Sequence, residues 1–192
     1  MRLLDGKAKA MVVTPSRAAA VKYKLSFDKY IKDHGYEGIK ALIAFSGKVA
    51  VEIEEDGVKR TAEFEEEKMN KFSALALKDE FDRDEYQVLL VANKYQTGFD
   101  QPKLTAMYID KKLRGVGAVQ TLSRLNRIYP PYNKKTFILD FKNSYDDIQK
   151  AFAPYYTRTI LKQTITLLSD DELKKRVLHV FIEDVYKKLK ND

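Results

Sequence analysis

The chain has 192 residues, of which 44% are hydrophobic and 33% charged, a balance typical of one folded domain with a sizeable core. It contains no cysteine, which excludes disulfides and thiolate metal sites, and its apolar runs are shorter than the roughly 18 residues of a membrane span. The formal net charge of +7 favours a polyanionic partner, since neutralised phosphates release counterions. We expect a cytoplasmic protein without a membrane segment, because the N-terminus lacks an apolar signal core.

Five short apolar runs predict the strands of a parallel sheet. They are rich in Val, Ile, Leu and aromatic residues, and they lie at 8–14, 39–45, 86–92, 104–110 and 136–141. Near-continuous apolar strands are typical of sheets covered by helices on both faces. Helices are predicted from Ser16 as N-cap, over about 65–81 and over about 116–127. Strands that alternate with helices indicate an α/β fold.

Two regions depart from this alternation. Residues 49–64 alternate apolar and polar side chains around an Asp56-Gly57 turn, which predicts a β-hairpin or insertion near 48–64. Beyond about Ser144 the pattern becomes helical, with a capping box at 169–172 and an apolar stripe after it. We therefore predict one domain over 1–148 and a helical extension over 149–192.

The strongest motif lies in the third predicted helix. Gln120, Arg124 and Arg127 are spaced to share one face, and Ala118, Leu122 and Leu125 form an apolar stripe opposite it. A guanidinium is always charged and its planar fork suits phosphate oxygens, so this face predicts a phosphate contact. The alternative interpretation is an ordinary solvated basic face.

Polar residues also follow the first, second and third strands of the predicted sheet. Gly98 and Asp100, with Thr97, come after the run at 86–92, where ligands bind in open α/β sheets. Groups that donate hydrogen bonds to a phosphate are predicted after the first two runs, at Thr14, Ser16, Arg17, Ser46 and Gly47. Each segment is also compatible with an ordinary turn or helix cap.

In this order the segments resemble the second RecA-like domain of superfamily 2 helicases and translocases. Thr14 to Arg17 is similar to motif IV, Thr97 to Asp100 to motif V, and Gln120, Arg124 and Arg127 to motif VI. The match over roughly residues 8–150 is closer to one branch, the R (restriction) subunit of type I restriction enzymes. Asn93 stands where we expect an acidic residue.

The resemblance implies a motor that moves double-stranded DNA with ATP and Mg²⁺. It implies that Arg124 and Arg127 act in catalysis and contact ATP together with Gly98, Asp100 and Gln120. It further implies DNA contacts from Thr14, Ser16, Arg17, Ser46, Gly47 and Thr97. The expected partners are the first RecA-like domain of the same full-length chain and the modification and specificity subunits of the complex.

The sequence has no G-x-x-x-x-G-K-[ST] loop, and Asp79 to Asp82 resembles a DExD box by its letters alone. We therefore expect a fragment that does not hydrolyse ATP by itself, with a nuclease and a first motor domain upstream. Two alternatives remain open at this point. One is the equivalent domain of another superfamily 2 DNA or RNA helicase, and the other is a non-catalytic module that retains the fold.

Overall fold

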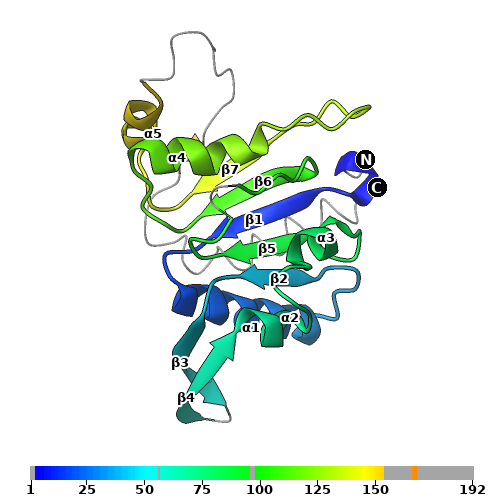
Figure 1. Cartoon of the computed structure of the whole chain (residues 1–192), viewed down its shortest axis with the longest axis vertical. Coiled ribbons are helices and arrows are strands. Elements are labelled where there is room, and N and C mark those ends of the chain that lie inside the picture. The colour runs from blue at the N-terminus through cyan, green and yellow to red at the C-terminus, as the bar shows by residue number, and fades with distance from the viewer. Residues whose placement is uncertain (1–2, 56, 96–97, 154–165, 168–192) are drawn as a thin grey trace.

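The computed structural model describes residues 3–55, 57–95, 98–153 and 166–167. Its centre is a parallel sheet in the order β2-β5-β1-β6-β7-β8 (Figure 1). The strands are β1 (Lys9–Val13), β2 (Ala41–Ala44), β5 (Val88–Val91), β6 (Leu104–Ile109), β7 (Phe137–Asp140) and β8 (Thr166–Leu167). The first five correspond to the five predicted strands. The predicted RecA-like arrangement, a parallel sheet flanked by helices, is confirmed.

Alternate residues of the central strands are buried on opposite faces of the sheet. Met11 and Val13 of β1 pack in one cluster with residues of three helices, whereas Ala10 and Val12 pack with α1. The long helix α1 (Arg17–Asp33) lies on the second face, and α3 (Leu77–Asp82), α4 (Gly115–Leu122) and α5 (Tyr145–Phe152) lie on the first. Burial on both faces explains why the strand sequences are apolar almost throughout.

The predicted hairpin is also present. It consists of β3 (Lys48–Glu55) and β4 (Val58–Glu65), which form a separate antiparallel sheet beside α1 (Figure 1). Val51 is buried against the α1 face of the core, and Ile53 packs there partly buried. The apolar side of the hairpin therefore anchors it to the domain.

The single helix predicted over 65–81 is wrong. Two short helices, α2 (Glu66–Asn70) and α3, replace it, and Lys71 between them has a left-handed backbone with φ 66°. The Asn70 side chain accepts from the Ile43 N–H at 3.0 Å and donates to the Ile43 carbonyl at 2.7 Å. It thereby provides hydrogen-bond partners at the outer edge of β2, which has no neighbouring strand on that side among the described residues. The helix breaks where this contact is made.

The chain turns helical after Ser144, as predicted, because Ser144 and Asp147 form a capping box at the start of α5. Of the extension predicted from 149 onward, the described residues include the end of α5 and β8, which pairs with β7. The capping box predicted at 169–172 and the stripe after it lie outside the described residues. Among the helices that are described, none is both long enough and apolar enough to span a bilayer.

Candidate functional site

Two arginines join the predicted motif VI to the segment that follows β5. Arg124 Nη1 donates to the Phe99 carbonyl at 3.1 Å, and Arg127 Nε donates to Asp100 Oδ1 at 2.8 Å. Phe99 is buried in the core beneath α4, so the segment that accepts both bonds is fixed to the sheet. The structure therefore brings Asp100 together with Arg124 and Arg127, which the sequence placed in a separate motif.

A third cation, Lys134, supports the same segment from its far end. Lys134 Nζ donates to the carbonyls of Pro102 and Leu104, both at 3.0 Å. Burial, and secondarily the positive charge of Arg127, lowers the pKa of Lys134 to about 8. Lys134 and Arg127 are therefore close enough for their charges to interact.

The helix that carries motif VI is shorter than predicted. α4 ends at Leu122 and tightens into a 3₁₀ turn, η2 (Ser123–Leu125). The Ser123 hydroxyl donates to the Gln120 carbonyl at 3.3 Å, a side-chain bond that is common where helices end. Arg127 follows the turn, so the prediction that it shares a helical face with Gln120 is wrong. Gln120 is exposed on α4, and among the described residues its side chain has no hydrogen bond to either arginine.

The apolar stripe opposite the arginines is buried as predicted, at Ala118, Leu122 and Leu125. Arg124, however, is half-buried rather than solvent-facing, and its Nε is buried with no hydrogen-bond partner among the described residues. Such an orphan donor costs on the order of 1–3 kcal/mol. Arg127 is 46% exposed, and within the described chain only its Nε is bonded. The unbonded guanidinium nitrogens of Arg127 suit an acceptor-rich anion such as a nucleotide phosphate.

The residues predicted to contact DNA after β1 and β2 meet at one place. Arg17 Nη1 donates to the Ser46 carbonyl at 2.9 Å, and a side chain at Gly47 would approach that nitrogen at 3.3 Å. Ser16 is exposed and caps α1 by accepting from the Ala19 N–H at 3.0 Å. Ser16, Arg17, Ser46 and Gly47 therefore form one exposed group at the carboxyl ends of β1 and β2.

Thr14 does not belong to this exposed group. Its side chain is fully buried, and its hydroxyl lies 3.0 Å from the Val91 carbonyl, to which it donates inside the sheet. A hydroxyl enclosed in this way does not reach a phosphate, so the predicted DNA contact of Thr14 is corrected. Thr97 lies outside the described residues. Gly98 is exposed with φ +71°, a backbone conformation that favours glycine.

Sequence reasoning missed Glu66 and Lys94. Glu66 Oε2 accepts from the Phe45 N–H at 2.7 Å, while Oε1 accepts from Lys94 Nζ at 2.6 Å. Glu66 is the middle residue of a Glu65–Glu67 run that reads as a solvated charged stretch, so no sequence signal distinguishes it.

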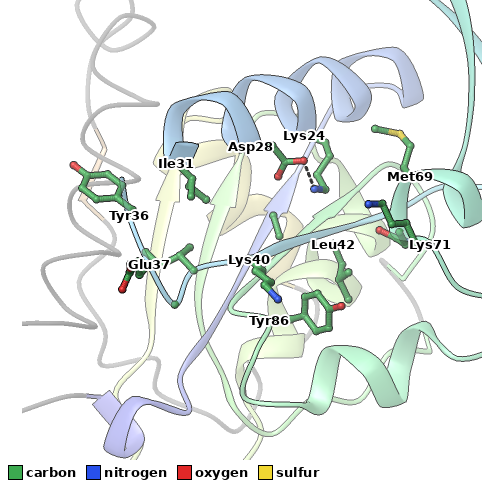
Figure 2. Close-up of a pocket in the computed structure, with 14 residues that line it drawn as sticks. Lys24, Asp28, Ile31, Tyr36, Glu37, Lys40, Leu42, Met69, Lys71 and Tyr86 are labelled. Atoms are coloured by element: carbon green, nitrogen blue, oxygen red, sulfur yellow. Dashed lines mark hydrogen bonds and ion pairs between the residues drawn. The ribbon is translucent and has the colours of Figure 1, made fainter. Parts of the chain in front are cut away.

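A pocket of about 540 Å³ lies near the amino-terminal end of β2, between α1 and the residues around Lys71 (Figure 2). Lys24, Lys40 and Tyr86 are among its lining residues, and none of the predicted site residues lines it. In the part of the chain that is described, no cluster of three or more His, Cys, Asp or Glu side chains suits a metal ion. We therefore assign no residue of this chain to Mg²⁺.

Comparison with known proteins defines the class. Residues 6–143 match the family model of type I restriction enzyme subunit R domain 3. The type I restriction enzyme MjaVIIP endonuclease subunit of Methanocaldococcus jannaschii is 33% identical over 129 residues, 65% of this chain and 12% of that protein. The MjaVIIIP endonuclease subunit of the same organism is 27% identical over 183 residues, 92% of this chain and 17% of that protein.

This chain thus belongs to the type I restriction enzyme R subunit family, in the part that forms domain 3. The family match decides against the alternative of a different superfamily 2 helicase. Among solved structures, the C-terminal domain of the DEAD-box protein Dbp5 aligns with 92% of this chain and 82% of its own, at 13% identity and a TM-score of 0.46. That likeness is too distant to assign any residue.

Proposed function

We propose that this chain is the second motor domain of an R subunit that translocates double-stranded DNA at the expense of ATP before the DNA is cut. The observation that carries the proposal is the pair of bonds from Arg124 and Arg127 to residues 99–100, which leave other guanidinium nitrogens for a phosphate. The named relatives are endonuclease subunits, which supports a role in DNA cleavage for the full-length protein.

ATP and Mg²⁺ would be held mainly by the first RecA-like domain of the full-length subunit. Arg124 and Arg127 would stabilise the charge that develops on the transferred phosphoryl group, with Gly98, Asp100 and Gln120 lining the same side. The isolated chain, which has no phosphate-cradling loop, is expected to release no phosphate from ATP with or without DNA. ATP hydrolysis that co-purifies with the chain through repeated purification steps would contradict this expectation.

The exposed group at Ser16, Arg17, Ser46 and Gly47 would contact the DNA backbone, together with Thr97. Contacts of this kind position a protein on DNA without reading its sequence. The recognition site would be read by the specificity subunit, in a complex that also contains the modification subunit. Because the proposed substrate is DNA inside the cell, we expect the complex in the cytoplasm.

Translocation by the assembled enzyme tests this function. Movement along DNA displaces a triplex-forming oligonucleotide placed downstream of the recognition site. Arg127→Ala should stop displacement and leave DNA binding intact. Normal displacement by Arg127→Ala, measured beside an Arg114→Ala control at the exposed start of α4, would refute the motor assignment.

A further inference from the structure

Glu66 occupies an unusual position for a carboxylate. Its side chain is only 5% exposed, and each of its two oxygens binds a different segment of the chain. Oε2 accepts from the N–H of Phe45, the residue after β2, and Oε1 accepts from Nζ of Lys94, which follows β5. A buried charge with two partners is costly to disturb, because loss of one partner leaves the other uncompensated.

From Lys94 a series of contacts leads to the arginines. Lys94 Nζ lies 5.2 Å from the centre of the Tyr95 ring, and the Tyr95 and Phe99 rings lie 4.8 Å apart. The Phe99 carbonyl accepts the bond from Arg124. The position of Lys94 is therefore linked to the position of motif VI through packed side chains.

From Phe45 a second series leads to the exposed group after β1 and β2. Ser46, the residue after Phe45, accepts the bond from Arg17 through its carbonyl. The N–H of Phe45 is the point at which Glu66 fixes the start of this loop. Glu66 thus lies between the residues proposed to contact DNA and those proposed to contact ATP.

We infer that the Glu66–Lys94 ion pair is a positioning device that couples DNA binding to ATP turnover; this inference rests on the proposed function. Glu66 and Lys94 touch neither ligand. They hold the loop after β2 and the segment after β5 in one fixed relation, so a shift of one displaces the other. Without the pair, each site keeps its own residues but responds less to the other.

The test compares Glu66→Gln and Lys94→Met in the full-length subunit within its complex. Glutamine keeps an acceptor for the Phe45 N–H and removes the charge that pairs with Lys94. The control is Glu85→Gln, which makes the same charge change in the exposed Lys40–Glu85 pair. Three quantities are measured for each protein: ATP turnover without DNA, ATP turnover at saturating DNA, and the DNA dissociation constant.

Both variants should lower the stimulation of turnover by DNA at least about 5-fold, the lower end of typical coupling between sites. Turnover without DNA and DNA affinity should stay within about 2-fold of wild type, and the double variant should be no worse than either single one. Glu85→Gln should behave as wild type. If either single variant melts early, the double Glu66→Gln/Lys94→Met variant decides, because it leaves neither charge of the buried pair without a partner.

Full DNA stimulation in Lys94→Met overturns the inference. So does an equal loss of turnover with and without DNA, which marks a merely structural role. If Arg124→Ala and Arg127→Ala lose turnover while stimulation survives in both ion-pair variants, this inference fails and the proposed function stands. If both arginine variants keep normal turnover, the proposed function fails and the inference falls with it.

Discussion

Asp100 accepts a hydrogen bond from Arg127 Nε at 2.8 Å across 27 positions of sequence. Within the described chain this bond engages only Nε and leaves the terminal nitrogens of Arg127 without a hydrogen bond. Arg124 is held differently, by a main-chain carbonyl and by burial of its Nε. The two arginines should therefore contribute unequally to stability, although the proposed function gives them similar chemical roles.

Arg124→Ala should lower the free energy of unfolding by about 1–3 kcal/mol, because it removes the bond to Phe99 and the packing of a half-buried stem. Arg127→Ala should cost less than about 1 kcal/mol, since exposed ion pairs contribute little. Urea unfolding of the isolated chain measures both values. Equal losses would mean that Arg124 is not held as described.

Asn70→Ala should destabilise the domain by about 2–3 kcal/mol, because it leaves the N–H and carbonyl of Ile43 without their partner at the edge of β2. Asn133→Ala, at an exposed position, is the matched control and should stay within about 0.5 kcal/mol of wild type. The same urea titration applies. A neutral Asn70→Ala would show that water replaces the side chain at no cost.

Lys9 makes the stability of the domain depend on pH in a predictable direction. Its Nζ donates to the carbonyls of Arg83 at 2.8 Å and Tyr86 at 2.6 Å, and burial, followed by the charge of Lys103, lowers its pKa from 10.5 to about 8. As the pH rises from about 8 to 10.5, the folded state releases its proton before the unfolded state does. The unfolded state then binds more protons, so this group makes stability rise with pH over that interval.

Lys9→Met should flatten this rise, although Lys134, whose pKa is also lowered to about 8, should retain part of it. Lys22→Met, at an exposed position on α1, should keep the full slope. Unfolding free energies between pH 8 and 10.5 supply the measurement. An unchanged slope in Lys9→Met would refute the assignment.

Most of the fold follows from local sequence signals. The five apolar runs predicted strands because burial on both faces demands apolar residues throughout, and Ser16 predicted the start of α1 because its oxygen accepts from a free N–H. These are short-range rules that a single segment satisfies on its own. They also placed Asp100 after β5 and Arg17 after β1.

The errors arise where tertiary contacts decide. The spacing of Met69, Phe72 and Ala76 fits one helix. The helix ends at Asn70 instead, where the Asn70 side chain forms hydrogen bonds with the edge strand β2. The sequence around Thr14 suggests a hydroxyl that donates to a phosphate, but the fold buries that hydroxyl inside the sheet. Glu66 is indistinguishable from its acidic neighbours, because only the fold brings Phe45 and Lys94 to it.

DNA binding by this chain should be weak, independent of sequence and steeply salt-dependent. Arg17→Ala should weaken it and reduce the slope of log K against log salt by about one unit, the loss of one phosphate contact. Lys78→Ala, exposed on α3 away from this group, should leave the slope unchanged. Fluorescence anisotropy at several salt concentrations gives the slopes. Identical slopes for wild type and Arg17→Ala would remove Arg17 from the DNA contact.

DNA-stimulated ATP turnover of the full-length subunit tests the central claim most directly. If Arg124 and Arg127 stabilise phosphoryl charge, alanine at either position should lower turnover on the order of 10³-fold, as removal of an arginine finger does. Arg127→Lys should recover little of the ATP turnover that Arg127→Ala loses, because an ammonium lacks the planar fork that could bind Asp100 and a phosphate together. The Arg114→Ala control should keep normal turnover. Near-wild-type turnover in both alanine variants would contradict the assignment of this domain to an ATP-driven motor.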